Sequence, residues 1–504
     1  MSVTQPDLPV VVVGAGPIGL AAASHLAERR LDFVVLESGP GVAAAIEEWR
    51  HVKLFSPWRY DLDSAAQRLL EQAGGWTAPD ADTLPTGGDL IDAYLAPLAK
   101  TAALTDKIRY NAPVVAVTRL GFDRIRTAGR EHAPFLVRLA DGTELLASAV
   151  VDAAGTWRRP NVLGGSGILA RGEDAVSESI SRALPDVLGR DRERFAGRRT
   201  AVVGAGHSAA TTLLELGELA DQVPGTEVVW VVRGADQART YGGGDADELP
   251  ARGALGSRLR NLVQSGRVEL VSNFRIEAVA KTADGRVALT AGGRRVERAV
   301  AGSPAETVPA GTVPSEARRV VVDVVVNSTG FRPDHEIVGE LRLDLDPILG
   351  STRALAPLID PNQHSCGTVP PHGVDELAHP EPGYYAVGAK SYGRAPTFLL
   401  ATGYEQARSV VAALAGDRDA ARDVQLDLPE TGVCSSNLAY GVRTVEAAES
   451  GGCCGPVPQA VELTTSASAG PASAPTTRGL ATGIAGGLLT VVESSSANQK
   501  GCCH

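Results

Sequence analysis

One local pattern occurs twice in this chain, and it restricts the possible folds more than any other feature. A run of β-branched residues, Val10–Val13, leads directly into Gly14-Ala15-Gly16-Pro17-Ile18-Gly19. Residues 20–30 then place apolar side chains at helical spacing, and a second apolar run, Phe33–Leu36, ends at Glu37. Uninterrupted apolar runs of this length are typical of strands buried on both faces of a parallel sheet. The order strand, glycine turn, helix and strand predicts a βαβ unit that binds a dinucleotide.

The residue types of this first turn suit a pyrophosphate. Gly14 allows the tight turn, Gly16 lets the backbone approach the ligand, and Gly19 lets the helix pack on the strand. The N-terminus of the helix offers free N–H groups and the positive end of its dipole. Glu37 can accept hydrogen bonds from ribose hydroxyls and would repel a 2′-phosphate, which predicts FAD or NAD. The predicted contact residues here are Gly14, Gly16, Pro17, Ile18, Gly19, Glu37 and Ser38.

The same pattern returns about 190 residues later. Residues 200–203 lead into Gly204-Ala205-Gly206-His207-Ser208-Ala209, a helix is expected over about 208–220, and a strand over 227–232 ends at Arg233. Arg233 follows the second strand, as Glu37 does in the first unit, and an arginine there can pair bidentately with a 2′-phosphate. This favours NADPH over NADH, and a solvent-exposed loop arginine is the alternative interpretation. The predicted contact residues of this unit are Gly204, Gly206, His207, Ser208 and Arg233.

Further strands are expected outside the two units. The buried ones are Ala149–Asp152, residues 320–326 as a single strand, and residues 384–387. The first leads into Ala153-Ala154-Gly155-Thr156-Trp157, the second into Asn327-Ser328-Thr329-Gly330-Phe331, and the third into Gly388 and a helix from about Thr397 to Leu414. Residues 114–117 and Phe135–Leu139 alternate like antiparallel strands, with a hairpin turn at Asp141-Gly142. Val114 and Val115, at the start of that sheet, are included among the predicted cofactor contacts.

Composition excludes several classes of protein. All six cysteines lie at or after Cys366, so a redox dithiol or a disulfide framework is excluded from the first 365 residues. The formal charge of −11 argues against a nucleic-acid partner, because phosphate binding needs a basic face. The N-terminal residues lack the basic segment of a secretory signal, and no apolar stretch is long enough to span a bilayer. We therefore expect a cytoplasmic protein without a membrane partner.

The two glycine turns with Glu37 and Arg233 resemble those of the two-dinucleotide-binding flavoproteins, and more narrowly those of the flavin-containing monooxygenases. The sequences at Ala153–Trp157 and Ser328–Phe331 match that family's two crossovers between domains. Residues 384–388 match its C-terminal flavin-contacting segment. The family motif FxGxxxH is not met, because no histidine follows Phe195-Ala196-Gly197.

Three segments look closer to the flavoproteins of bacterial arsenic-resistance operons. They are residues 180–197, 206–208 and 360–367. From residue 451 onward Ser, Ala, Gly, Thr and Pro dominate without any aromatic residue, which predicts a disordered tail. The expected fold is α/β, with two Rossmann-like dinucleotide-binding domains, the NADPH domain inserted in the FAD domain, and this tail. The expected ranges are 1–157 and 332–430 for FAD binding, 158–195 as a connecting segment, 196–331 for NADPH binding and 431–504 for the tail.

The resemblance implies a monooxygenase that uses FAD and NADPH. NADPH would reduce the flavin, the reduced flavin would form a C4a-(hydro)peroxide with O2, and one oxygen atom would pass to a small-molecule substrate. The further cofactor contacts that it implies are Ala154, Gly155, Thr329, Gly330, Gly388 and Thr397. Arg394 is the candidate catalytic charge beside the flavin, with a structural ion pair as the alternative, and His207 has the alternative of a cap or packing residue. A homodimer is compatible with these features.

The cysteine-bearing tail leaves two alternatives open. Vicinal thiolates bind soft metalloids, so Cys434, Cys453 and Cys454 are candidate ligands of such an ion. The chain would then be a flavin-dependent metal or metalloid reductase that uses the tail thiols. The other alternative is a flavin-binding redox sensor without catalytic activity. Incidental cysteines in a reducing cytosol are the simplest interpretation of the tail.

Overall fold

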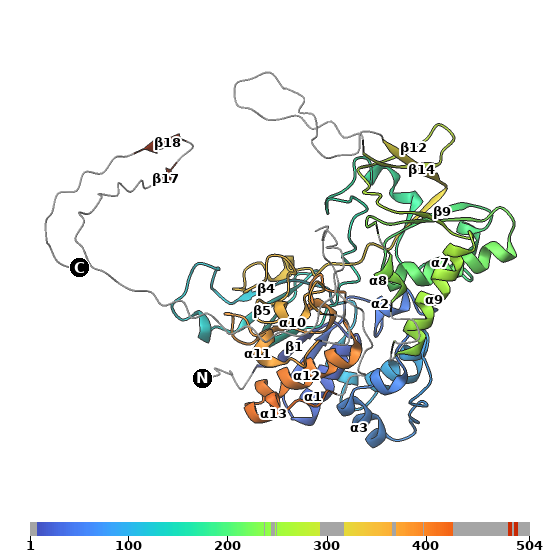
Figure 1. Cartoon of the computed structure of the whole chain (residues 1–504). Helices are drawn as coiled ribbons and strands as arrows, with labels where there is room; N and C mark the ends of the chain where they lie inside the picture. Colours follow the sequence, from blue (N-terminus) through green and yellow to red (C-terminus); the bar gives the residue numbers. More distant parts are fainter. Residues whose placement is uncertain are drawn as a thin grey trace, which may run out of the picture. The chain divides into compact units, whose positions relative to one another are not determined.

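The structure is a computed structural model of the chain (Figure 1). It describes residues 8–235, 237–242, 247, 249–292, 317–364, 369–396 and 398–426, and the backbone of two short strands near the C-terminus. Contacts divide the chain into two units, Met1–Leu438 and Ala439–His504. In the second unit β17 (Thr482–Ala485) and β18 (Leu488–Val491) form an antiparallel pair. The rest of the predicted disordered tail lies outside the described residues.

The first parallel sheet has five strands in the order β16-β7-β1-β2-β3. Its strands are β1 (Val10–Val13), β2 (Phe33–Leu36), β3 (Ile108–Arg109), β7 (Ala149–Asp152) and β16 (Tyr384–Ala386). Val10 lies opposite Phe33 on one side and Ala149 on the other. All four residues of β1 are buried, because both faces of the sheet are covered. The strands predicted at β1, β2 and β7 are confirmed, and the one predicted at 384–387 ends one residue earlier.

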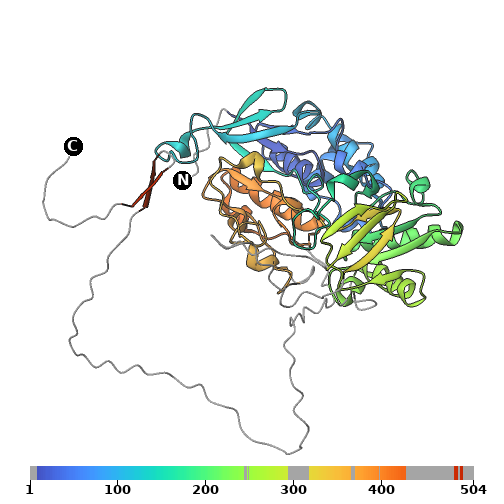
Figure 2. The same cartoon turned by 90° about the horizontal axis from the view of Figure 1, so that it is seen from above.

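Two helices that lie far apart in the sequence cover one face of this sheet. They are α1 (Pro17–Glu28) and α12 (Leu400–Leu414), which share one core with β1 and lie side by side in both views (Figures 1 and 2). Helix α1 begins at Pro17, before the predicted residue 20, because proline at the first helical turn has no N–H group to leave unpaired. Helix α12 begins at Leu400, and the predicted start, Thr397, lies outside the described residues.

An antiparallel sheet covers the other face. Its strands are β4 (Val114–Arg119), β5 (Phe135–Leu139) and β6 (Glu144–Ala147). Buried side chains from β4, β5 and β6 form one core with Val11 and Val13 of β1. The predicted hairpin turn is confirmed between β5 and β6, where Gly142 has a φ of 88° and Leu139 N donates to Thr143 O at 2.9 Å.

The second half of the first unit repeats this arrangement. The order of its parallel sheet is β11-β10-β9-β15-β8. Its strands are β8 (Ile180–Ser181), β9 (Arg199–Val203), β10 (Glu227–Val231), β11 (Glu269–Val271) and β15 (Val324–Asn327). One face packs on α7 (His207–Gln222) and α9 (Pro250–Gln264). The other face packs on antiparallel β12 (Ala278–Lys281), β13 (Val287–Ala291) and β14 (Arg318–Val322). The predicted α/β class with two Rossmann-like sheets is confirmed.

One predicted strand is wrong. Residues 320–326 form not one strand but the end of β14 and the start of β15, which belong to different sheets. Asp323 separates them: its side chain accepts a hydrogen bond from Arg199 N at 2.8 Å, and its own N–H donates to Arg199 O at 2.8 Å. These bonds turn the chain from the outer layer into the central sheet. Ser148 joins β6 to β7 in a similar way, because its N–H donates to Pro9 O at 3.0 Å.

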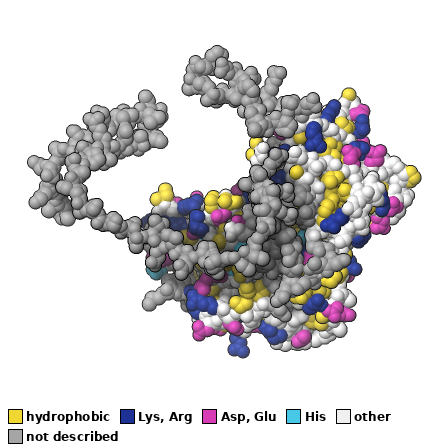
Figure 3. Space-filling view, viewed as in Figure 1, with side chains coloured by type: hydrophobic (Ala, Val, Ile, Leu, Met, Phe, Trp, Pro, Cys, Tyr) yellow, Lys and Arg dark blue, Asp and Glu magenta, His cyan; other side chains and the backbone are white. Residues whose placement is uncertain are grey.

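The remaining helices are short connections, apart from α3. They are α2 (Ala44–Glu47), α3 (Ser64–Ala73), α4 (Gly87–Asp89), α5 (Ala96–Ala99), α6 (Arg192–Phe195), α8 (Ala238–Tyr241), α10 (Ala356–Ile359), α11 (Val374–Leu377) and α13 (Arg418–Arg422). No helix in the described part of the chain is long and apolar enough to cross a membrane. On the face that Figure 3 shows, basic and acidic side chains are interspersed where the surface is described.

Candidate functional site

The first glycine turn lies at the carboxyl end of β1. Gly14 has a φ of 97°, and a Cβ there would lie 2.9 Å from Ala153 O. A Cβ on Gly19 would lie 1.9 Å from Gly14 O, so the start of α1 can pack closely only without side chains. At Gly16 nothing lies within 4 Å of the Cβ position, and this residue caps α1 with no side-chain hydrogen bond. The turn is therefore closed toward the protein and open at Gly16, which fits a pyrophosphate.

Glu37 stabilises this turn through a hydrogen bond to its backbone. Its side chain is buried, Oε2 accepts from Ala15 N at 2.8 Å, and Oε1 accepts from Gly39 N at 2.8 Å. A carboxylate has further lone pairs, so these bonds leave room for a ribose hydroxyl. Ser38 is exposed, and its hydroxyl donates to Glu37 Oε1 at 3.3 Å. The backbone of Ala112 donates to Glu37 O at 2.8 Å, which brings the segment before β4 alongside.

Val114 and Val115 lie at the start of the antiparallel sheet instead of in the parallel sheet that carries the turn. Val114 is half-buried and Val115 is 46% exposed. Their strand pairs with β5, with a register shift between Val114 and Ala116. The described contact between this region and the turn is made by the preceding residues, Asn111 and Ala112, which bond to Gly39 O and Glu37 O.

The second glycine turn has the same construction at the end of β9. Gly204 has a φ of 137°, and a Cβ there would lie 2.0 Å from Ser328 O. Gly206 has nothing within 4 Å of its Cβ position and caps α7 without a side-chain bond. Arg233 follows β10 and is exposed, with no ion pair among the residues that the structure describes. The residues present fit a second dinucleotide whose 2′-phosphate faces a cation.

His207 and Ser208 begin helix α7. The His207 ring packs against Phe55, with ring centroids 5.0 Å apart. This is the packing role that the sequence left open, and it joins the second turn to the segment that follows α2. Ser208 is half-buried, and its carbonyl accepts from the Thr212 hydroxyl at 2.9 Å.

The two crossover segments close the two turns in matching ways. Ala153 N donates to Val13 O at 2.9 Å, and Ser328 N donates to Val203 O at 2.9 Å. Ala154 N then bonds to Asp152 Oδ1 at 3.2 Å, as Thr329 N bonds to Asn327 Oδ1 at 3.2 Å. The glycines that follow, Gly155 and Gly330, have φ angles of 66° and 93°. All four predicted residues, Ala154, Gly155, Thr329 and Gly330, therefore lie at the carboxyl edges of the sheets.

A third glycine lies between the first turn and α12. Gly388 has a φ of 70°, and a Cβ there would lie 3.0 Å from Ile18 Cγ1. Its N–H donates to Gln406 Oε1 at 2.7 Å. The Gln406 amide also contacts Ser391 Oγ at 2.9 Å and His372 Nε2 at 2.9 Å. Burial lowers the pKa of His372, so its neutral ring can accept the amide proton. Sequence reasoning missed Gln406 and His372, whose role depends on contacts distant in the chain.

A buried ion pair lies close to Gly388 in the sequence and joins β7 to the segment after β16. Lys390 Nζ and Asp152 Oδ2 are 2.5 Å apart, and both side chains are 1% exposed. The Tyr384 hydroxyl donates to the same carboxylate oxygen at 3.1 Å, and burial holds the pKa of Tyr384 well above its usual range. Sequence reasoning missed this pair also. A lysine in the otherwise uncharged segment 384–393 was the available signal.

Arg394 is exposed, and its backbone N–H donates to Leu349 O at 2.8 Å. The charge of Arg394 acts on Arg332: burial lowers the pKa of Arg332, and the charge of Arg394 lowers it further. Arg332 Nε donates to Asn161 Oδ1 at 2.9 Å. Two cations thus lie close together beyond the second crossover. Arg394 takes part in no ion pair within the described ranges.

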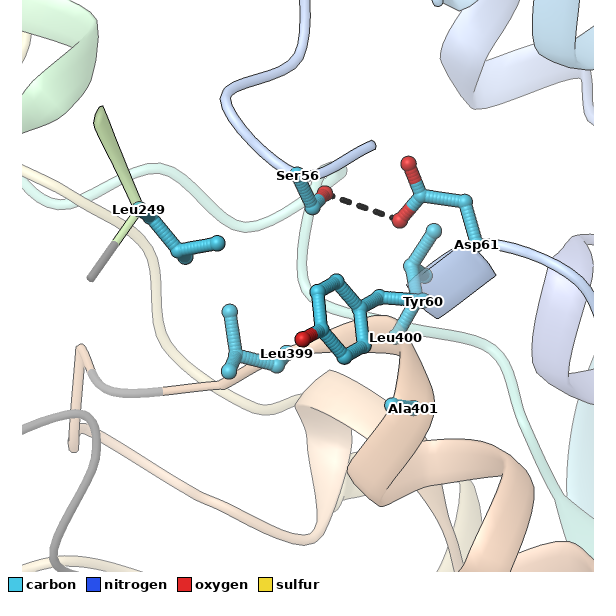
Figure 4. Close-up of a pocket in the computed structure, with 7 residues that line it drawn as sticks. All are labelled: Ser56, Tyr60, Asp61, Leu249, Leu399, Leu400 and Ala401. Carbon is cyan, nitrogen blue, oxygen red and sulfur yellow. Dashed lines mark hydrogen bonds between the residues drawn. The ribbon is translucent and has the colours of Figure 1, made fainter. Parts of the chain in front are cut away.

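A small pocket lies between the two halves of the first unit (Figure 4). Its lining residues are Ser56, Tyr60, Asp61, Leu249, Leu399, Leu400 and Ala401. They come from the segment after α2, from the residue before α9 and from the start of α12. The pocket leaves room for about one water molecule. Asp61 is the one lining residue with a carboxyl group. Burial raises the pKa of Asp61 to about 7, although the hydrogen bond from Ser56 lowers it.

The candidate metalloid ligands Cys434, Cys453 and Cys454 lie outside the described residues. Within the residues that are described, no group of three His, Cys, Asp or Glu side chains could hold a metal ion.

The sequence model of the pyridine nucleotide-disulphide oxidoreductases matches residues 11–301. This is more than half of the chain. The chain belongs to this family. The predicted resemblance to flavin-containing monooxygenase-like flavoproteins is confirmed at this level.

The curated relatives are plant enzymes. The indole-3-pyruvate monooxygenase YUCCA8 of Oryza sativa subsp. indica is 28% identical over 222 residues, which are 41% of this chain and 45% of that protein. The chain therefore matches less than half of the length of this relative. Among solved structures, the bacillithiol disulfide reductase Bdr (YpdA) from Bacillus cereus has a TM-score of 0.55 at 16% identity and covers 81% of this chain and 99% of its own.

A second similar structure is DfoA, a cadaverine monooxygenase of Erwinia amylovora bound to FAD. Its TM-score is 0.53 at 14% identity, and the match covers 86% of this chain and 99% of that one. At such identities the likeness establishes the fold alone. That fold is shared by a disulfide reductase and a monooxygenase, so the choice between the two activities depends on the residues of this chain.

Proposed function

We propose that the protein is an NADPH-dependent FAD oxidoreductase of the monooxygenase type. The observation that carries the proposal is the pair of equivalent turns, each closed at its first glycine and open at its second. The buried carboxylate of Glu37 accompanies the first turn, and the exposed cation of Arg233 accompanies the second. A ribose without a 2′-phosphate suits Glu37, whereas a 2′-phosphate suits Arg233.

Bound FAD and NADPH would supply hydride transfer and the activation of O2. The residues of the chain would hold and orient the two cofactors. The open turn at Gly16 and the start of α1 would bind the FAD pyrophosphate, and Gly206 with α7 would bind that of NADPH. Gln406 fixes the backbone of Gly388 beside Ile18, where it would support the flavin side of the site. In these terms FAD binding belongs to residues 1–157 and 332–430, NADPH binding to 196–331, and 158–195 connects them.

The cysteine distribution supports O2 as the electron acceptor. Disulfide reductases relay electrons through a dithiol beside the flavin or in the nicotinamide domain. The sequence has no cysteine before Cys366. The name of the rice relative as a monooxygenase supports the same choice. The proposed substrate is a small molecule. The proposed location is the cytoplasm, and the protein would act as a monomer or a homodimer.

The finer proposal is a role in arsenic resistance. It rests on the resemblance of residues 180–197, 206–208 and 360–367 to flavoproteins of arsenic-resistance operons, and residues 365–367 lie outside the described part. The competing function, a metalloid reductase that uses the tail thiols, rests on the vicinal pair Cys453-Cys454 in the sequence.

The test is anaerobic reduction followed by reoxidation of the purified full-length protein. We expect NADPH to bleach the flavin absorbance faster than NADH does, and air to restore it without any added disulfide or metalloid. Protein without flavin after refolding with FAD would overturn the proposal. Flavin that NADPH reduces but that air leaves reduced until arsenite or Hg(II) is added would favour the metalloid reductase instead.

A further inference from the structure

The small pocket of Figure 4 contains one carboxyl group, and only one of its two oxygens accepts a hydrogen bond within the described structure. Asp61 is fully buried, and its Oδ1 accepts from the Ser56 hydroxyl at 2.8 Å. Its Oδ2 is buried and has no hydrogen-bond partner in the described structure. Figure 4 shows Ser56 directed at this carboxyl, with Tyr60 beside the pair and the Leu249 and Leu399 side chains across the pocket. A buried polar oxygen left without a partner costs free energy, so its retention calls for a role.

The surroundings of Asp61 favour its neutral form. Tyr404 from α12 donates to the backbone oxygen of Asp61 at 2.8 Å and not to its carboxyl group. Asp63, two residues further on, is paired with His25 at 3.1 Å. Among the described residues no cation pairs with the Asp61 carboxyl. Since burial raises its pKa to about 7, a proton resides on this group near neutral pH and is still released easily.

The overall reaction of the proposed function consumes a proton. Substrate, O2, NADPH and one H⁺ give oxygenated substrate, NADP⁺ and water. The oxygen atom that does not enter the substrate takes up protons as it leaves as water. A positioned side chain can deliver this proton during the reaction, and an acid with a pKa near the working pH is the most effective donor.

We propose that Asp61 delivers the proton that each oxygenation consumes. The proposal rests on the proposed function. The O–H bond of the Asp61 carboxyl breaks, the proton forms an O–H bond of the departing water, and the remaining carboxylate regains a proton from solvent before the next turnover. The size of the pocket agrees with this role, because it admits a group about as large as one water molecule. Ser56 stabilises the carboxylate between these steps.

The first test measures the protonation of Asp61 without any turnover. Because its pKa is higher in the folded than in the unfolded protein, the contribution of Asp61 to wild-type stability falls as the pH rises from about 4 to about 7 and then levels off. Asp61→Asn removes this loss. We expect the melting temperature of Asp61→Asn to exceed that of the wild type by a margin that grows from pH 5 to pH 8. The exposed control Asp106→Asn should show a constant difference. A margin that does not change with pH would overturn the proposal.

The second test separates proton delivery from cofactor binding. Asp61→Asn should reduce the O2-dependent kcat by about 100-fold or more and remove the loss of activity above pH 7, while anaerobic reduction by NADPH stays near the wild-type rate. Ser56→Ala removes a bond that lowers the pKa of Asp61, so its activity should persist to higher pH. If the loss of activity above pH 7 persists in Asp61→Asn, another group delivers the proton and the proposal is overturned.

The two tests fail in different ways. A wild-type protein that consumes no O2 contradicts the proposed function, whereas the melting curves still report the state of Asp61. Stabilisation of the wild type by ammonium chloride relative to sodium chloride, lost in Asp61→Asn, would make Asp61 the counter-ion of a bound cation and would overturn proton delivery.

Discussion

Glu37 and Arg233 follow equivalent strands but have opposite charges and different environments. Glu37 is buried and accepts hydrogen bonds from the backbone N–H groups of Ala15 and Gly39, while Arg233 is exposed and free of ion pairs within the described residues. A buried, hydrogen-bonded acid organises a turn before any ligand arrives. An exposed arginine is available to bind a charged group of a ligand, such as a 2′-phosphate. The two positions therefore predict different consequences of substitution.

Replacing Arg233 should affect the choice of nicotinamide cofactor. We expect Arg233→Gln to raise the KM for NADPH by about 10- to 100-fold, which corresponds to a charge-assisted hydrogen bond of about 1.5–3 kcal/mol. The KM for NADH should change little, since NADH has no 2′-phosphate. Steady-state kinetics with both cofactors measure this, and Arg319→Gln, an exposed arginine of β14, is the control. An equal change for NADPH and NADH would remove Arg233 from the phosphate site.

A side chain at Gly16 or Gly206 should be compatible with folding but should block the bound ligand. A Cβ meets no atom within 4 Å at Gly16 or at Gly206, whereas at Gly14 it meets Ala153 O at 2.9 Å. We expect Gly16→Val to fold with a melting temperature close to that of the flavin-free wild type but to retain little FAD. Gly206→Val should keep FAD and lose NADPH affinity. Gly14→Val should destabilise the protein itself. Flavin content and NADPH titration distinguish them, and full FAD occupancy in Gly16→Val would contradict the assignment of the first turn.

At the level of elements, the antiparallel sheet is joined to the chain before β16 by a buried cluster. Glu381 accepts from Arg119 Nε at 2.8 Å and from Arg130 Nη2 at 2.8 Å, and all three side chains are nearly inaccessible. Burial alone would raise the pKa of Glu381, but the hydrogen bonds from Arg130 and Arg119 outweigh it and hold the pKa below its usual value. This cluster attaches β4 and β5 to the strand that leads into Gly388.

Breaking this cluster should be costly, because two arginines would remain buried without their counter-ion. We expect Glu381→Gln to lower the free energy of unfolding by about 3–5 kcal/mol in urea titrations. In the wild type the contribution of Glu381 should be present above its unfolded pKa and be lost as the pH falls through its lower folded pKa. The exposed pair Arg138–Glu144 is the control, and Glu144→Gln should cost less than about 1 kcal/mol. Equal costs for the two variants would contradict the structural role of Glu381.

Local sequence predicted the strands and turns well where one pattern acted alone. The runs at β1, β2 and β7 and the turn at Gly142 needed no distant partner to be recognised. The division between β14 and β15 was missed, because valines on both sides of Asp323 look continuous until Arg199 binds that acid. Gln406 and Lys390 were missed for the same reason: their partners, Gly388 N and Asp152, meet them only after the sheet has assembled.

At the level of the whole molecule, the account depends on which acceptor takes the electrons. A disulfide reductase and a monooxygenase both have structures similar to this fold, so the fold does not decide between the two activities. The difference lies in the cysteines, which are absent from the first 365 residues of this chain. If O2 is the acceptor, the thiols of the C-terminal region are dispensable for turnover. If a disulfide or a metalloid is the acceptor, they are essential.

The most direct test compares the full-length protein with a full-length variant in which all six cysteines are serine. O2 consumption and NADPH oxidation are recorded together, without any added disulfide or metalloid. The account predicts that one O2 disappears per NADPH in both proteins, at rates that agree within about two-fold. NADPH oxidation that proceeds without O2, depends on arsenite, Hg(II) or a disulfide, and ceases in the serine variant would contradict it.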